Sequence, residues 1–122
     1  MISAEQVVAI HEAILKDEPG LHGRTDIAAL EGAMARVENL KQYEGVDDVF
    51  EHAALYAIAL ARGHVFSDAN KRTALVTCLT YLEIQGFPLK RSQTLEDIMV
   101  EVAEGNIERS DLADILYSLV SE

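Results

Sequence analysis

Residues 64–75 read HVFSDANKRTAL, and the rest of the chain is organised around them. An imidazole, a carboxylate, an amide and two adjacent cations lie within the first nine of these residues: His64, Asp68, Asn70, Lys71 and Arg72. The apolar residues that follow recur at helical spacing, so we expect a polar loop that leads directly into a helix. The remaining segments are interpreted as the scaffold of this loop.

Apolar residues at helical spacing on both sides of the loop predict an all-α fold of about six helices. The expected helices run from Ser3 to the break at Pro19-Gly20, from Thr25 or Asp26 to Leu40, from Asp47 to Gly63, from Asp68 or Ala69 to Gly86, from Thr94 to Gly105, and from Ser110 to Val120. The third is apolar on nearly every side, which is typical of a buried helix. Gly63 suits the left-handed position that ends a helix.

Composition and charge limit the class of protein. With 122 residues and 49% hydrophobic residues, we expect residues 1–122 to form one domain. A net charge of -11 disfavours direct binding to nucleic acid or to a membrane surface. The single cysteine, Cys78, the lack of a signal peptide and the lack of a membrane-spanning apolar run favour a cytoplasmic location.

The polar groups of the loop suit chemistry on phosphates. The first backbone N–H groups of a helix have no helical partner and bind anions, and we expect those of Ala69, Asn70 and Lys71 to do so. The Asn70 amide, Lys71 and Arg72 would hold phosphate oxygens, and Asp68 could hold a magnesium ion. His64 could accept a proton from an attacking hydroxyl, so the residues favour phosphoryl or nucleotidyl transfer.

A purely structural interpretation of the same residues stays open. Asp68 could simply cap the helix or form a surface pair with Arg72, and His64 could be an ordinary loop residue. Two further groups are interpreted as structural. His11 lies on the apolar stripe of the first helix as a core histidine, and Lys90-Arg91 is interpreted as a solvated basic pair.

The stretch from His64 to Thr73 resembles the signature of the Fic/Doc family, histidine-x-phenylalanine-x-acid-small-asparagine-x-arginine. The flanking residues, the short length and the order of helices resemble the Doc (death on curing) toxins in particular. This resemblance implies a helical Fic-like fold with ATP and Mg2+ as cofactors. It assigns His64 as the general base, Asp68 as the magnesium ligand, and Asn70, Lys71 and Arg72 as the phosphate binders.

Lys71 is the informative position in this resemblance. Most family members that transfer AMP have glycine there, and the lysine of Doc-like members goes with an inverted nucleotide whose terminal phosphate faces the histidine. The resemblance therefore implies a kinase that phosphorylates a threonine of elongation factor Tu and arrests translation. An AMP transferase that tolerates Lys71 and a catalytically silent binding domain remain alternatives.

The family's internal inhibitory motif, Ser/Thr-x-x-x-Glu-Gly/Asn, is absent from this sequence. No Glu-Gly or Glu-Asn pair has serine or threonine four residues before its glutamate. The resemblance therefore implies control by a separate Phd-like antitoxin whose flexible tail folds onto the toxin.

Overall fold

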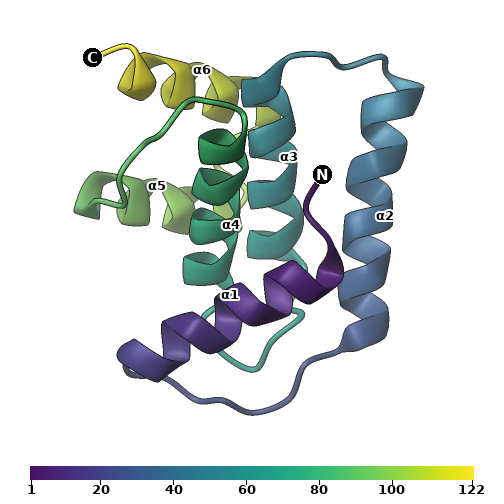
Figure 1. Cartoon of the computed structure of the whole chain (residues 1–122), viewed down its shortest axis with the longest axis vertical. Helices are drawn as coiled ribbons and strands as arrows, with labels where there is room; N and C mark the ends of the chain where they lie inside the picture. Colours follow the sequence, from purple (N-terminus) through teal and green to yellow (C-terminus); the bar gives the residue numbers. More distant parts are fainter.

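The computed structural model describes all residues from 1 to 122 and contains six helices and no strand (Figure 1). They are α1 (Ala4–Asp17), α2 (Ile27–Tyr43), α3 (Val49–Arg62), α4 (Asn70–Ile84), α5 (Gln93–Ala103) and α6 (Arg109–Val120). The predicted all-α fold is confirmed. No helix combines the length with the apolar character that a membrane span requires.

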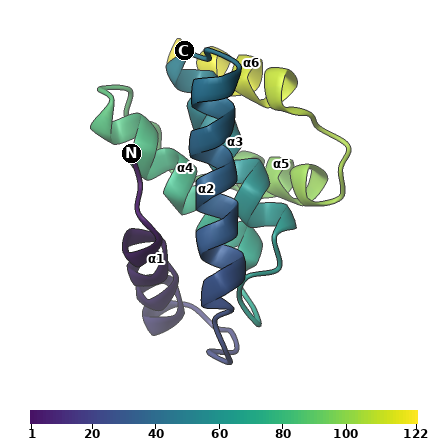
Figure 2. The same cartoon turned by 90° about the vertical axis from the view of Figure 1, so that its right-hand side faces the viewer.

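The centre of the fold is α3, which packs against α2, α4, α5 and α6. Alanines buried along α3, such as Ala53, Ala54 and Ala57, let its neighbours approach closely. Figure 1 shows α1 crossing the lower end of α4, with α5 and α6 running across the direction of α2, α3 and α4. In the view of Figure 2, α1 and α5 lie to either side of α2. The prediction that the third helix is buried is confirmed, and one continuous cluster of 26 buried residues forms the core.

Helix caps account for most of the helix starts. Ser3 and Gln6 have the sequence spacing of a capping box, and α1 has one, since Ser3 Oγ accepts from the N–H of Gln6 and the Gln6 side chain accepts from the N–H of Ser3. Three other predicted caps were wrong by one or two residues. Asp48 rather than Asp47 caps α3, and Ser92 rather than Thr94 caps α5, because their side-chain oxygens reach the free N–H groups of those helices. Ser110 lies inside α6, which follows Glu108 and has no side-chain cap.

The expected left-handed turn at Gly63 was wrong, because it lies one residue later. Gly63 has φ -81°, whereas His64 has φ 50°. A Cβ at Gly63 would lie 2.6 Å from the carbonyl oxygen of Ala59, so the glycine is required for close packing at the end of α3. The sharp turn therefore falls on the candidate base itself, in a conformation uncommon for a residue with a side chain.

The second helix is less buried at its ends than its pattern indicates. Its apolar residues recur at helical spacing, which predicts one buried stripe. Leu30, Met34 and Val37 enter the core, but Ile27 is 52% exposed and Leu40 is 38% exposed. They lie in the first turn and near the end of α2. Only the apolar residues in the middle of α2 are therefore buried.

Candidate functional site

The first turn of α4 is open to a ligand. Ala69 precedes it in a left-handed conformation, with φ 65°, and no side chain caps the helix. The N–H groups of Asn70, Lys71 and Arg72 have no partner within the chain. The N–H of Ala69, also expected to be free, instead donates to Oδ1 of Asp68 at 2.8 Å. The free donors are therefore shifted by one residue toward Arg72, and they make this helix start suitable for an anion.

Asn70 clamps the loop that precedes α4. Its Oδ1 accepts from the N–H of Phe66 at 3.0 Å, and its Nδ2 donates to the carbonyl of Phe66 at 2.9 Å. Both polar atoms of the amide thus satisfy one residue's backbone, while the second hydrogen on Nδ2 remains for a ligand. Asn70 fixes the shape of the loop, a role that its position in the sequence did not indicate.

His11 of α1 holds the same loop from the opposite side. Its Nε2 donates to the carbonyl oxygen of Asp68 at 2.9 Å, and its ring stacks on Phe66 with centroids 3.8 Å apart and planes 5° apart. His11 is only 4% exposed, so the prediction of a core histidine with a satisfied ring nitrogen is confirmed. Its partner lies 57 residues away, and no local pattern could have identified it.

Asp68 is oriented by two backbone groups. Oδ2 accepts from the N–H of Leu21 at 2.9 Å and Oδ1 accepts from Ala69, and these bonds, together with nearby Arg72, hold the pKa of the carboxyl below its usual value. The side chain is 44% exposed. Asp68 therefore does not cap the first turn of α4, and its contact with Arg72 is loose, at 3.9 Å.

The surroundings of Asp68 fit one ligand of a magnesium ion. Its carboxylate is a hard, partly exposed oxygen donor that stays ionised. No group of three or more histidine, cysteine, aspartate or glutamate residues is placed to hold a metal ion. Magnesium in nucleotide sites is commonly held by one or two carboxylates together with phosphates and water, and this arrangement needs no further protein ligand.

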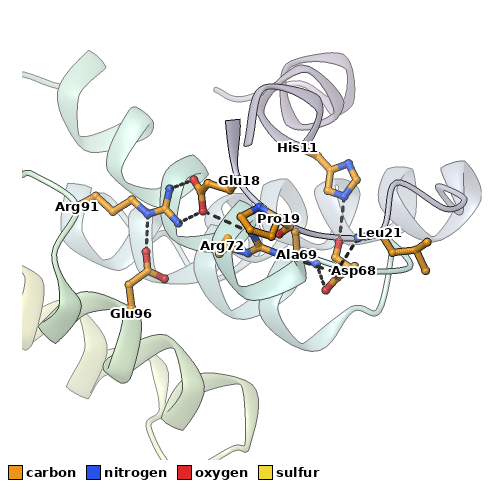
Figure 3. A network of polar contacts seen from close by, with 9 residues as sticks. All are labelled: His11, Glu18, Pro19, Leu21, Asp68, Ala69, Arg72, Arg91 and Glu96. Atoms are coloured by element: carbon orange, nitrogen blue, oxygen red, sulfur yellow. Dashed lines mark hydrogen bonds and ion pairs between the residues drawn. The ribbon is translucent and has the colours of Figure 1, made fainter. Parts of the chain in front are cut away.

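A chain of ion pairs borders the site (Figure 3). Arg72 Nη1 donates to the carbonyl of Pro19 at 2.8 Å and lies 3.5 Å from Glu18 Oε1. The two oxygens of Glu18 also accept from Arg91 at 2.6 and 3.0 Å, and Arg91 pairs with Glu96 of α5. The bonds from Arg91, supported by Arg72, hold the pKa of Glu18 below its usual value. The expectation that Arg91 is merely solvated was wrong, because Glu18 lies within reach only in the folded chain.

The loop between α1 and α2 packs directly against the site. A Cβ on Gly20 would lie 3.0 Å from Arg72 Nη2, 3.1 Å from Asp68 Oδ2 and 2.5 Å from Leu15 Cδ2. Only glycine allows this approach without displacement of the neighbouring side chains. The loop therefore packs against Asp68 and Arg72, two residues that line the first cavity, and is not simply an exposed connection.

The residues singled out in the sequence line two cavities along the loop. The first, of about 400 Å³, is lined by residues 67–72 and by four residues of α5, including Gln93 and Asp97. The second, of about 430 Å³, is lined by residues 24–26 and 64–67. Asp68, Asn70, Lys71 and Arg72 thus share one cavity, whereas His64 faces the other. Ser67 lines both.

Comparisons with known proteins show what the chain is similar to. The family model described as Fic/DOC family matches residues 1–82. Over 118 residues the chain is 42% identical to "Protein kinase doc" of Escherichia phage P1, which covers 97% of this chain and 94% of the relative. It is 34% identical over 94 residues to "Toxin Doc" of Mycolicibacterium smegmatis, covering 72% of this chain and 71% of that protein.

Proposed function

The chain belongs to the Fic/DOC family, and from this premise we propose that it is a Doc-type toxin that acts as a protein kinase. The observation that carries the proposal is the open first turn of α4, where three unpaired N–H groups lie beside the free cation of Lys71. The name of the phage P1 relative supports kinase activity and the use of ATP. The name of the mycobacterial relative supports a toxin.

In the proposed reaction, ATP lies with its phosphates in the first cavity. The N–H groups of Asn70, Lys71 and Arg72 donate to phosphate oxygens, and the side chains of Lys71 and Arg72 offset the negative charge. Asp68 would hold Mg2+, which when bound neutralises part of the phosphate charge. The Asn70 amide adds its remaining N–H.

His64 acts from the second cavity as the general base. An acceptor hydroxyl approaches along residues 24–26 and forms an O–P bond to the γ-phosphorus, while the bond from that phosphorus to the bridging oxygen breaks. The hydroxyl proton passes to the imidazole of His64, and ADP leaves with the electron pair of the broken bond. Separate binding places for the nucleotide and the acceptor are supported by the two cavities, which have only Ser67 in common.

We further propose the biological setting that the resemblance to Doc toxins implies. The acceptor is a threonine of elongation factor Tu, the result is arrested translation in the cytoplasm, and a Phd-like antitoxin provides control. The net charge of -11 supports a partner with basic residues and argues against direct nucleic-acid or membrane binding. Residues 1–122 would act as one domain.

Labelled ATP tests the reaction. The protein is incubated with Mg2+ and elongation factor Tu, and transfer is compared between ATP labelled at the γ-phosphate and ATP labelled at the α-phosphate. Label transferred only from the γ position is the expected result. Transfer from the α position would identify an AMP transferase, and no transfer from either would favour a catalytically silent binding domain; both outcomes would overturn the kinase proposal.

A further inference from the structure

His11 makes two contacts with the loop before α4 and lies outside the set of residues that the proposed reaction uses. Figure 3 shows its ring above Asp68, with Nε2 directed at the backbone carbonyl of that residue. The His11 ring also provides an apolar surface, because it stacks in parallel on the ring of Phe66. An apolar residue could fill the same volume, so the hydrogen bond is the part of this contact that packing alone does not require.

Residues 11–21 bind both acceptor groups of Asp68, its main-chain carbonyl and its carboxylate. His11 donates to the main-chain carbonyl at 2.9 Å, and Leu21, ten residues further along, donates its N–H to the carboxylate at 2.9 Å. The side chain of Asp68 then has little freedom to turn away from the cavity. Since Ala69 follows in a left-handed conformation that a residue with a Cβ rarely adopts, the peptide between Asp68 and Ala69 needs such external support.

We propose that His11 is a positioning residue for the phosphate and magnesium site. By fixing the Asp68 carbonyl, it sets the direction of the Asp68 carboxylate and the left-handed turn at Ala69, and so aims the free N–H groups of the first turn of α4. The effect on transfer rests on the proposed kinase function. The effect on loop geometry does not.

Two substitutions at His11 separate its hydrogen bond from its packing. His11→Phe keeps an aromatic ring against Phe66 but has no donor for the Asp68 carbonyl. His11→Gln loses the stack and places an amide N–H close to the position of Nε2. The matched control is Val7→Ala, because Val7 is also buried on α1, one turn earlier, and has no polar contact with the loop.

The readouts are the amide NMR signals of Ala69 and Asn70 in the free protein, the affinity for MgADP, and the Mg2+ dependence of transfer from ATP. We expect His11→Phe to fold, to shift both amide signals, to weaken MgADP binding at least threefold and to raise the Mg2+ concentration for half-maximal activity. His11→Gln should recover part of each change. Val7→Ala should lower Tm without altering the amide signals or the Mg2+ dependence.

Wild-type amide signals and wild-type MgADP affinity in His11→Phe would overturn the inference. So would the same changes in Val7→Ala, since they would then follow from loss of stability alone. If His11→Phe fails to fold, His11→Gln decides the question through the same amide signals. A wild-type protein that transfers no phosphate would defeat the proposed function, while the amide signals would still test His11.

Discussion

The signature stretch contains two kinds of residue, and the structure treats them differently. Phe66, Asn70 and Arg72 are tied to other parts of the chain by a stacked ring, a paired amide and a guanidinium with several acceptors. His64 and Lys71 are exposed, and their side chains make no hydrogen bond within the chain. Held residues therefore shape the loop, and Asn70 and Arg72 also face the proposed phosphates, whereas the open side chains are left to contact the ligand alone.

This division separates stability from activity. Replacing an open residue removes little from the folded state, because no internal contact is lost. Replacing a held residue breaks hydrogen bonds of the loop, so the free energy of unfolding and the activity fall together. Variants of the two classes should therefore fall into two groups when activity is compared with Tm.

The largest expected effect is at His64. His64→Asn should lower kcat by about 10²- to 10⁴-fold, the usual contribution of a general base, with Tm nearly unchanged. Asparagine is the suitable replacement because it tolerates the left-handed backbone at this position better than alanine. Steady-state kinetics and thermal unfolding check both parts. An active His64→Asn protein would place His64 outside the reaction.

Lys71 should show the next largest effect. Lys71→Met keeps a similar side-chain length without the charge, and we expect the KM for ATP to rise about 10- to 100-fold, because a hydrogen bond to a charged group contributes about 1.5–3 kcal/mol. Tm should stay the same, since Lys71 has no partner in the chain. A loss of stability equal to that of a held residue would contradict the division.

Asn70 provides the contrasting case. Asn70→Ala leaves the backbone N–H and carbonyl of Phe66 without partners, and we expect the free energy of unfolding to fall by about 1–3 kcal/mol as transfer also falls. Urea unfolding followed by circular dichroism measures the first effect. Unchanged stability with lost activity would move Asn70 into the open class.

The smallest expected effect is the loss of stability that acid causes through protonation of Glu18. Its folded-state pKa is lowered by Arg91 and Arg72, so its contribution to stability is present above the unfolded pKa, near 4.5, and is lost as pH falls through the lower folded-state value. Glu18→Gln should therefore give a flatter dependence of Tm on pH below about 4.5 than the wild type. Parallel pH profiles for the two proteins would argue that the ion-pair chain is not maintained in solution.

Local sequence patterns predicted the helices well because those patterns are themselves local. The Ser3 capping box, the buried third helix and the polar loop before α4 all depend on residues within a few turns of each other. The loop's supports could not be predicted in this way. The contact from His11 to Asp68 spans 57 residues, and the one from Arg91 to Glu18 spans 73.

The positions of the left-handed backbone conformations were also not predicted from the sequence. Glycine at position 63 indicated a left-handed turn, but the turn falls on His64, and a second one falls on Ala69, which no residue preference would select. Both conformations occur where the fold constrains the chain from several sides. Departures from residue preference of this kind are expected at functional sites.

Because α1 holds the loop through His11, the docking of α1 on α4 and the binding of a ligand at the anion site are coupled equilibria. When α1 detaches transiently from α4, the bond from His11 to Asp68 opens and the anion site loses its shape. A ligand that binds only the formed site must then favour the docked helix by the same free energy, because linkage is reciprocal. Hydrogen exchange in α1 should therefore slow on addition of MgADP, although α1 lines neither of the two cavities beside the loop.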